Sequence, residues 1–316
     1  MGPGSAILVR AGVLLGALLL LSAGCAAPQL AALPSQLPAS APARSELAAV
    51  PFFPQEDFQC GPAALATALV YAGVATSPEA LVPQVYLPAR EGSLQVEMLA
   101  AARRHERVAY PLAPRLADLL QEVGSGAPVV VLQNLALGIA PLWHYAVVVG
   151  YDLPRGEIIL RSGTTRRLVL SLATFERTWA RGDYWAMVTL PPERLPATAA
   201  EDRYVAAAAA LERVAPEPAR RAYHAALERW PGNLPARIGQ GNAAYAQRDL
   251  AGAEAAYREA TRRHPGAADA WNNLAQALHE LRRRDEALAA AQRAVDIGGP
   301  RLELYRATLK AAREER

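Results

Sequence analysis

The stretch QCGPAALATALVYAG (residues 59–73) decides the fold of the first part of this chain. Proline is tolerated in the first turn of a helix, and glycine often ends one. The residues between Pro62 and Gly73 are almost all apolar. The stretch therefore predicts a buried helix that begins at Cys60.

Two further helices and then several strands are predicted downstream. Helical patterns cover 96–104 and 116–123, and short apolar runs rich in β-branched residues lie at 128–132, 145–151, 158–160 and 185–190. Such runs, separated by glycine, proline and aspartate, are typical of strands. Helices first and strands afterwards predict an α+β domain with an antiparallel sheet.

The N-terminus has the layout of a secretory signal over residues 1–24. Arg10 precedes an apolar run at 11–21, which is too short to span a bilayer, since a spanning helix needs roughly 20 residues. The small residues ahead of Cys25 resemble a bacterial lipobox, which implies that Cys25 is acylated and anchors a bacterial lipoprotein in the lipid bilayer. A signal cut near Ala26-Ala27 is the alternative. Ala26 after Cys25 implies sorting to the outer membrane, with the folded part facing the periplasm.

The rest of the chain divides into three parts by composition. Residues 25–50 are rich in proline and alanine and lack a sustained apolar period, so they predict an extended tether. A globular composition begins at Pro51, and we place the first domain at 51–192. From about residue 200 to 316 the chain is rich in alanine and helical in pattern.

Cys60 is one of two cysteines in the chain. Thiols in an oxidising compartment are usually paired or used in chemistry. With Cys25 acylated, Cys60 has no partner within the chain, and a leftover thiol of this kind is either intermolecular or reactive.

His144 supplies a second reactive group, at the start of the predicted strand 145–151. A cysteine at a helix N-terminus followed by a histidine on a strand is the papain-like order. The helix macrodipole is expected to acidify the thiol, and a nearby imidazole can hold the thiolate as an ion pair. His144 would then protonate the leaving amine. The side-chain amide of Gln55 and the backbone N–H of Cys60 are candidates for the oxyanion hole.

Each of these residues can also be explained by a purely structural role, with no part in catalysis. Cys60 can be a small buried residue at a helix start, His144 a hydrogen-bonded core histidine, and Gln55 an ordinary loop residue. The remaining histidines show no metal-ligand spacing, so the sequence predicts no metal site.

The string PQEDFQCGPAALA (54–66), with HYAVVVGYD (144–152) downstream, resembles the bacteriocin-processing (double-glycine leader) cysteine peptidases and their stand-alone relatives. The resemblance covers roughly residues 50–192. It implies a papain-like fold and a peptide or protein substrate, with no cofactor. It also implies that Cys60 is the nucleophile, His144 the general base and acid, and Gln55 part of the oxyanion hole.

One position departs from this family. Its members usually carry an aspartate or asparagine that orients the imidazole, where this chain has Arg161-Ser162-Gly163. Ser162 can accept a hydrogen bond from His144 but is a weaker orienter than a carboxylate. Asp152 and Asn134 are the other candidates. Losing an orienter slows catalysis without removing the nucleophile and the oxyanion hole.

Small residues recur every 34 positions after Pro192, which is the tetratricopeptide period. Ala219, Ala253 and Ala287 form one such series, and Ala226, Ala260 and Ala294 form another. We therefore predict an all-α tetratricopeptide domain at 200–316, with the helix 301–316 as its cap and a groove for a protein partner. A generic alanine-rich helical bundle is the alternative.

Charge and composition exclude some classes of function. The net charge of +3 is spread over stretches of mixed sign, so nucleic acid is not an expected partner. Two classes are left. The first is a periplasm-facing cysteine peptidase, whose machinery would also suit an amidase acting on cell-wall peptides. The second is a catalytically weak or inactive adaptor lipoprotein.

Overall fold

The computed structural model describes residues 27–55, 59–136 and 138–314. The predicted signal at 1–24 and its Cys25 lie outside these residues. Internal contacts divide the chain into two compact units, one made of Met1–Thr67 with Pro111–Met187 and the other of Ala68–Tyr110 with Val188–Arg316. Each unit is described by itself. No helix within the described ranges is both long and apolar enough to cross a membrane.

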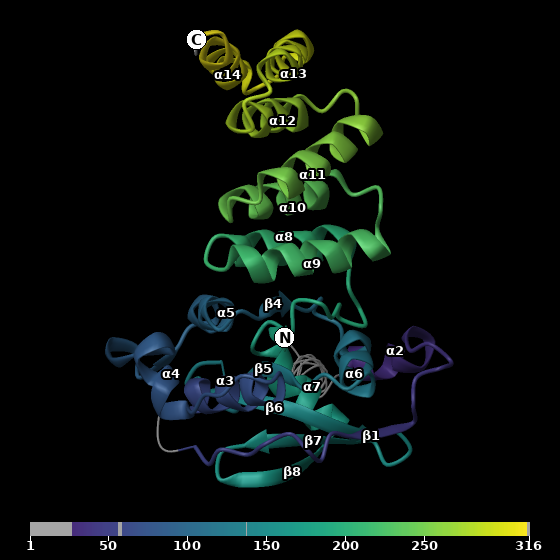
Figure 1. Cartoon of the computed structure of the whole chain (residues 1–316). Helices are drawn as coiled ribbons and strands as arrows, with labels where there is room; N and C mark the ends of the chain where they lie inside the picture. The colour runs from purple at the N-terminus through teal and green to yellow at the C-terminus, as the bar shows by residue number, and fades with distance from the viewer. Residues whose placement is uncertain (1–26, 56–58, 137, 315–316) are drawn as a thin grey trace, which may run out of the picture. The chain divides into compact units, whose positions relative to one another are not determined.

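The first unit contains helices that flank an antiparallel sheet (Figure 1). Its elements, some of which run on into the second unit, are α2 (Pro28–Gln36), β1 (Arg44–Glu46), α3 (Cys60–Tyr71), α6 (Leu116–Gly124), β5 (Val129–Asn134), β6 (Trp143–Asp152), β7 (Glu157–Ser162), β8 (Thr165–Ser171), α7 (Leu172–Ala180) and β9 (Ala186–Leu190). The helix predicted to begin at Cys60 is confirmed as α3. The predicted α+β class is likewise confirmed.

The sheet runs in the order β4-β9-β5-β6-β7-β8, where β4 is Val108–Pro111, and β1 pairs with the end of β6. Strand β6 is central to the site because it pairs antiparallel with β1, β5 and β7. Its register places His144 opposite Gln133 in β5 and Val147 opposite Arg161 in β7. The start of β6 therefore lies next to the end of β7.

Buried apolar strands explain the packing of this unit. All six residues of β5 are buried, which is typical of a strand covered on both faces. Helix α6 contacts β1, β5 and β6, and α7 contacts β5, β7 and β8. The rings of Phe175 and Trp179 on α7 stack with their centroids 5.5 Å apart and are fully buried.

The prediction of an extended tether at 25–50 is wrong from Pro28 onward. Helix α2 begins with a proline at its first position, and its Gln29 and Leu30 N–H groups each donate to a carboxylate oxygen of Glu176 at 2.8 Å. Glu176 is buried and lies on α7. Strand β1 then pairs with the end of β6. A buried carboxylate at the helix N-terminus, where N–H groups lack partners, thus holds this segment on the domain.

The second unit includes a short segment that follows α3 and ends with β4. It contains α4 (Pro78–Val85), β2 (Tyr86–Leu87), a 3₁₀ turn (Pro88–Arg90), β3 (Gly92–Ser93), α5 (Gln95–Arg104) and β4 (Val108–Pro111). Helices α4 and α5 pack together, and Arg104 on α5 donates to the backbone and side-chain oxygens of Gln84 on α4.

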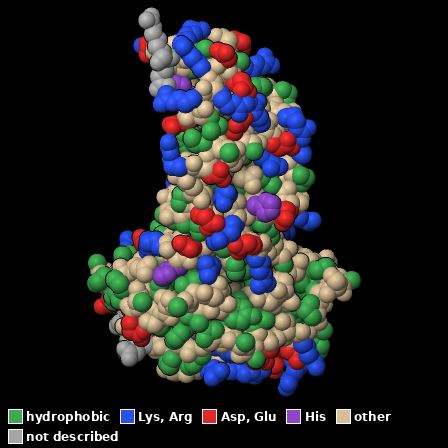
Figure 2. Space-filling model, in the orientation of Figure 1, with side chains coloured by type: hydrophobic (Ala, Val, Ile, Leu, Met, Phe, Trp, Pro, Cys, Tyr) green, Lys and Arg blue, Asp and Glu red, His purple; other side chains and the backbone are tan. Residues whose placement is uncertain are grey.

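The remainder of the second unit is a series of antiparallel helix pairs (Figure 1). The pairs are α8 (Glu201–Glu212) with α9 (Pro216–Arg229), α10 (Leu234–Ala246) with α11 (Leu250–Arg263), and α12 (Ala268–Glu280) with α13 (Arg284–Ile297), followed by α14 (Leu302–Glu314). Helices α9, α11 and α13 begin 34 residues apart, at 216, 250 and 284. The predicted repeat period is therefore confirmed. Acidic and basic side chains intermix over these helices (Figure 2).

Candidate active site

Cys60 begins α3, so its thiol lies where the helix presents N–H groups without intrahelical partners. The cysteine is free and half-buried. Backbone N–H groups, among them that of Tyr145, lie close enough to its sulfur to lower the pKa of the thiol. Because Tyr145 follows His144 directly in β6, the structure brings the sulfur to the start of the strand that carries the predicted base.

His144 is half-buried at the start of β6, and its ring is hydrogen-bonded on one side. Its Nε2 lies 2.9 Å from the hydroxyl oxygen of Ser162, the last residue of β7. Ser162 therefore occupies the orienting position. The other ring nitrogen, Nδ1, takes no part in this contact.

Gln55 is tied to the residue that follows Ser162. Its backbone N–H donates to the carbonyl of Gly163 at 3.1 Å, and its side-chain carbonyl accepts from the Gly163 N–H at 3.2 Å. Because the side-chain oxygen of Gln55 is occupied, its NH₂ group is the part left to donate to a ligand. Gly163 has φ of +56° in the turn between β7 and β8, a conformation that favours glycine.

One turn therefore fixes two of the predicted site residues. Ser162 contacts the imidazole of His144, and Gly163 holds Gln55 by two hydrogen bonds. The role of Gly163 was not predicted from the sequence. A glycine between two apolar runs indicates a turn, but it does not indicate what the turn will bind.

Burial affects the pKa values of both Cys60 and His144. Burial raises the pKa of the Cys60 thiol, and the backbone N–H groups near the sulfur only partly oppose this shift. Burial also lowers the pKa of His144. Both effects favour the neutral form, because desolvation disfavours charge. Burial therefore acts against the thiolate–imidazolium pair predicted from the helix dipole.

The other two candidate orienters have different partners. Asp152 lies at the opposite end of β6 from His144 and forms an ion pair with Arg44 at 3.0 Å. The side-chain oxygen of Asn134 accepts from the N–H groups of Ala136 and Leu142, and so closes the loop between β5 and β6. Of the three candidates, Ser162 is the one that contacts the imidazole.

Exposed apolar side chains directly precede the histidine in the chain. Ile139, Leu142 and Trp143 are 94%, 57% and 52% exposed. The ring of Tyr145, on the other side of His144, is buried and packs edge-on against Trp185 at 5.7 Å. Within the described ranges, no group of three or more His, Cys, Asp and Glu side chains is placed to hold a metal ion.

Comparison with known proteins agrees with this geometry. Residues 47–183 match the Peptidase_C39 like family, and residues 216–260 and 238–301 match the Tetratricopeptide repeat family. The first match spans Cys60, His144, Gln55 and Ser162. The chain therefore contains a Peptidase_C39-like domain, which is followed by tetratricopeptide repeats. The resemblance predicted from the Cys60 and His144 motifs is confirmed.

Several solved structures are similar to part of the chain, and one of them is described here. It is the crystal structure of a Bacillus anthracis protein described as a C39-like peptidase, with 18% sequence identity and a TM-score of 0.39. The similarity covers 46% of this chain and 97% of that protein. Among curated proteins, none matches the chain.

Proposed function

We propose that this chain is a membrane-anchored cysteine peptidase that hydrolyses peptide bonds through an acyl-enzyme on Cys60. The observation that carries the proposal is the meeting of three elements at one point. The Cys60 sulfur lies close to the Tyr145 N–H, His144 is bound by Ser162, and Gln55 is held by the adjacent Gly163. The match to the Peptidase_C39 like family supports the reaction class.

The chemistry begins at the Cys60 thiol. With Nε2–H donating to Ser162, Nδ1 of His144 takes the thiol proton as the Cys60 sulfur attacks the peptide carbonyl carbon. The carbonyl oxygen becomes an oxyanion, which accepts from the Gln55 NH₂ group and the Cys60 backbone N–H.

The carbon–nitrogen bond then breaks, and the imidazolium of His144 gives its proton to the leaving amine. This step leaves a thioester on Cys60. Water attacks the thioester with His144 again acting as base, and the products are a free carboxylic acid and the regenerated thiol.

The substrate in this proposal is a peptide with apolar side chains. Ile139, Leu142 and Trp143 lie just before His144 and expose the large apolar surfaces that such side chains would cover. The tetratricopeptide repeats would recruit a protein partner or the substrate itself, since arrays of this kind present extended binding surfaces.

The proposed location is a bacterial outer membrane, with the domain facing the periplasm. Its support is the signal-like pattern at 1–24, the lipobox-like residues before Cys25, and the alanine that follows. Acylated Cys25 would bind the lipid bilayer.

A specific observation favours a second candidate function. Ser162 offers a single hydroxyl where the family usually has an aspartate or asparagine, and burial raises the pKa of the Cys60 thiol. Both features suit a slow or inactive domain that acts as an adaptor. An amidase acting on cell-wall peptides would use the same groups as the peptidase and differs only in substrate.

Thiol labelling distinguishes the peptidase hypothesis from the adaptor hypothesis. A peptide-based, thiol-directed probe is added to the full-length chain, and adduct formation is followed by intact mass. We expect fast labelling that is lost in Cys60→Ala and slowed strongly in His144→Ala. His224→Ala is the matched control, because this histidine is exposed on α9. Labelling no faster than that of a free thiol, and unaffected by His144→Ala, would exclude the peptidase and support the adaptor.

A further inference from the structure

Arg161 is a buried cation next to the residue that contacts His144. It is 4% exposed and directly precedes Ser162 at the end of β7. Glu46 acts on this cation through space, but both oxygens of Glu46 accept from Arg167, at 2.8 and 2.9 Å. The hydrogen bonds of the Arg161 guanidinium go instead to backbone carbonyls of two separate segments. A buried charge is costly unless its donors have partners, so these carbonyls are what keeps it in place.

One set of these bonds holds the segment that leads to Gln55. Nε and Nη2 of Arg161 donate to the carbonyl of Val50 at 3.3 and 3.1 Å, and Nη2 also lies 3.5 Å from the carbonyl of Ala48. Val50 is fully buried, so its carbonyl needs a partner within the protein. Arg161 supplies that partner.

A further bond holds the hairpin that carries Ser162. The register of β7 and β8 shifts between Leu160 and Ser162, which marks a bulge. A bulge disrupts the hydrogen-bond ladder locally. Nη1 of Arg161 donates to the carbonyl of Arg166, in the bulged stretch of β8, at 2.6 Å. One guanidinium thus joins the β7–β8 hairpin to the segment that precedes the predicted oxyanion donor.

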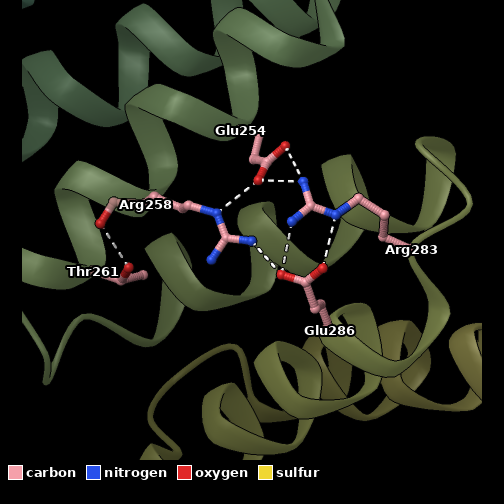
Figure 3. Close-up of polar contacts among 5 residues, drawn as sticks. All are labelled: Glu254, Arg258, Thr261, Arg283 and Glu286. Carbon is pink, nitrogen blue, oxygen red and sulfur yellow. Dashed lines mark hydrogen bonds and ion pairs between the residues drawn. The ribbon is translucent and has the colours of Figure 1, made fainter.

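Arginines in the helical repeats are bound differently. Arg258 and Arg283 are exposed, and each contacts the carboxylates of Glu254 and Glu286 (Figure 3). Their partners are charges at the surface, whereas those of Arg161 are carbonyls in the interior. The rigid fork of a guanidinium has donors on several sides, so it can bind two chain segments at once, which the single ammonium of a lysine does less well.

The link between Val50 and Gln55 is stiff. Its sequence is PFFP (residues 51–54). Proline fixes its own φ and also restricts the residue before it, so Val50, Pro51, Phe53 and Pro54 have little conformational freedom. The backbone N–H of Gln55 then donates to the turn after β7. A displacement at Val50 would therefore be passed on to Gln55 rather than absorbed between them.

The base does not depend on the Arg161 side chain in this way. His144 and Ser162 lie on neighbouring strands, and the backbone ladder between β6 and β7 fixes their separation. Ladder bonds use backbone groups alone, so they persist without the guanidinium. Residues 47–55, by contrast, form neither helix nor strand, and Gln55 has no ladder to hold it.

We propose that Arg161 is a positioning residue for the oxyanion hole. It fixes Val50 and, through the proline-restricted link, sets where the Gln55 amide lies, while the sheet sets the base. The role given to Gln55 rests on the proposed peptidase function. The placement of Gln55 by Arg161 does not, and it is measured without any activity.

Hydrogen exchange of the full-length chain tests this placement. We expect the Gln55 amide, which donates to the Gly163 carbonyl, to exchange at least about tenfold faster in Arg161→Gln, and the amides of β5 to change less than about threefold. An acceleration of the same size in β5 would mean that Arg161 stabilises the whole domain. Either that result or unchanged protection at Gln55 would overturn the proposal.

Two reactions of Cys60 separate the oxyanion hole from the base. In alkylation by iodoacetamide the sulfur displaces iodide, and no oxyanion forms. With p-nitrophenyl acetate the sulfur attacks the ester carbonyl, an oxyanion forms and collapses, and p-nitrophenolate leaves an acetyl thioester on Cys60. Because losing one oxyanion donor costs about 10²–10³ in rate, we expect Arg161→Gln to slow acylation about ten- to a hundredfold and alkylation less than about threefold.

The matched control is Arg167→Gln, which removes an exposed arginine from the same hairpin. Both of its rates should stay within about twofold of the parent chain, since exposed ion pairs contribute little. Slowing of acylation and alkylation by the same factor in Arg161→Gln would contradict a role in the oxyanion hole.

Two further variants keep the test decisive. Arg161→Lys retains the charge but binds fewer carbonyls, so its acylation rate should lie between those of the parent chain and Arg161→Gln. If neither variant folds, Pro51→Gly decides the result, because it loosens the link between Val50 and Gln55 and leaves the guanidinium in place. It should give the same selective changes in exchange and acylation, and unchanged values would overturn the proposal.

Failure of the peptidase function gives a different pattern. A parent chain whose Cys60 reacts with the ester no faster than a free thiol would exclude the peptidase. Hydrogen exchange at Gln55 would then decide the role of Arg161 by itself.

Discussion

Replacing Ser162 by alanine tests whether the hydroxyl positions His144. The variant removes one neutral hydrogen bond of 2.9 Å to Nε2. A bond of this kind contributes about 0.5–1.5 kcal/mol. Because about 1.4 kcal/mol corresponds to tenfold in rate, we expect the reaction of Cys60 to slow about two- to twelvefold. Loss of a carboxylate orienter in serine proteases costs about 10⁴ in rate, so a much smaller effect is expected from a neutral serine.

The assay needs no knowledge of the natural substrate. The second-order rate constant for alkylation of Cys60 by iodoacetamide is measured at pH 7 by intact mass, with Cys60→Ala as the blank. Thr165→Ala is the matched control, because it removes an exposed hydroxyl on the strand opposite Ser162 in the same hairpin. The control should keep the rate of the parent chain.

Two outcomes would refute this reasoning. An unchanged rate in Ser162→Ala would mean that the hydroxyl does not position the imidazole. A fall in the alkylation rate constant of more than about a hundredfold would mean that Ser162 contributes more than one neutral hydrogen bond can supply. Ser162→Asp gives the complementary result, since a carboxylate next to Nε2 should raise the pKa of His144 and speed alkylation.

Three other predictions concern protonation and packing. Because burial raises the pKa of the Cys60 thiol, its alkylation rate should climb through an inflection at a higher pH than that of an exposed cysteine, and a plateau from acidic to neutral pH would contradict this. Glu176→Gln replaces one of the two oxygens that hold the start of α2 by an amide donor, so the free energy of unfolding in a urea titration should fall by about 1–3 kcal/mol. Gly241→Ala places a methyl group against the ring of Tyr257, so it should lower the melting temperature and cost about 1–3 kcal/mol, whereas Gly266→Ala, which meets nothing within 4 Å, should not.

Local patterns in the sequence predicted much of the fold. The apolar run after Pro62 is long enough to define α3 by itself, and β5 and β6 each contain three consecutive valines. The repeats are visible because small residues must recur wherever paired helices approach closely. Gly241 shows this directly, since the ring of Tyr257 leaves no space for a side chain there.

Contacts between distant residues were not predictable from such patterns. Helix α2 lies in a segment with four prolines, and the carboxylate that holds its start is 147 residues from Gln29. Strand β1 has only three residues, and its pairing with β6 depends on tertiary structure.

The sequence proposed members for the candidate site but could not predict its electrostatics. Cys60, His144 and Gln55 were found from their motifs, and Ser162 was one of three open choices. The choice depended on the register of β6 and β7, which brings Ser162 within 2.9 Å of the ring. The thiol's pKa depended on burial, which competes with the helix N-terminus and cannot be read from the motif.

The docking of α2 by Glu176 also limits the distance over which the domain would work. If Cys25 carries lipid, as proposed, three peptide units separate it from Pro28, and even a fully extended chain covers only about 10 Å over that length. A free tether of the whole segment to Val50 would allow several times that reach. The part of the domain that holds α2 would therefore stay at the headgroup surface, and the enzyme would act on polypeptides that come to the membrane rather than on those diffusing through the periplasm.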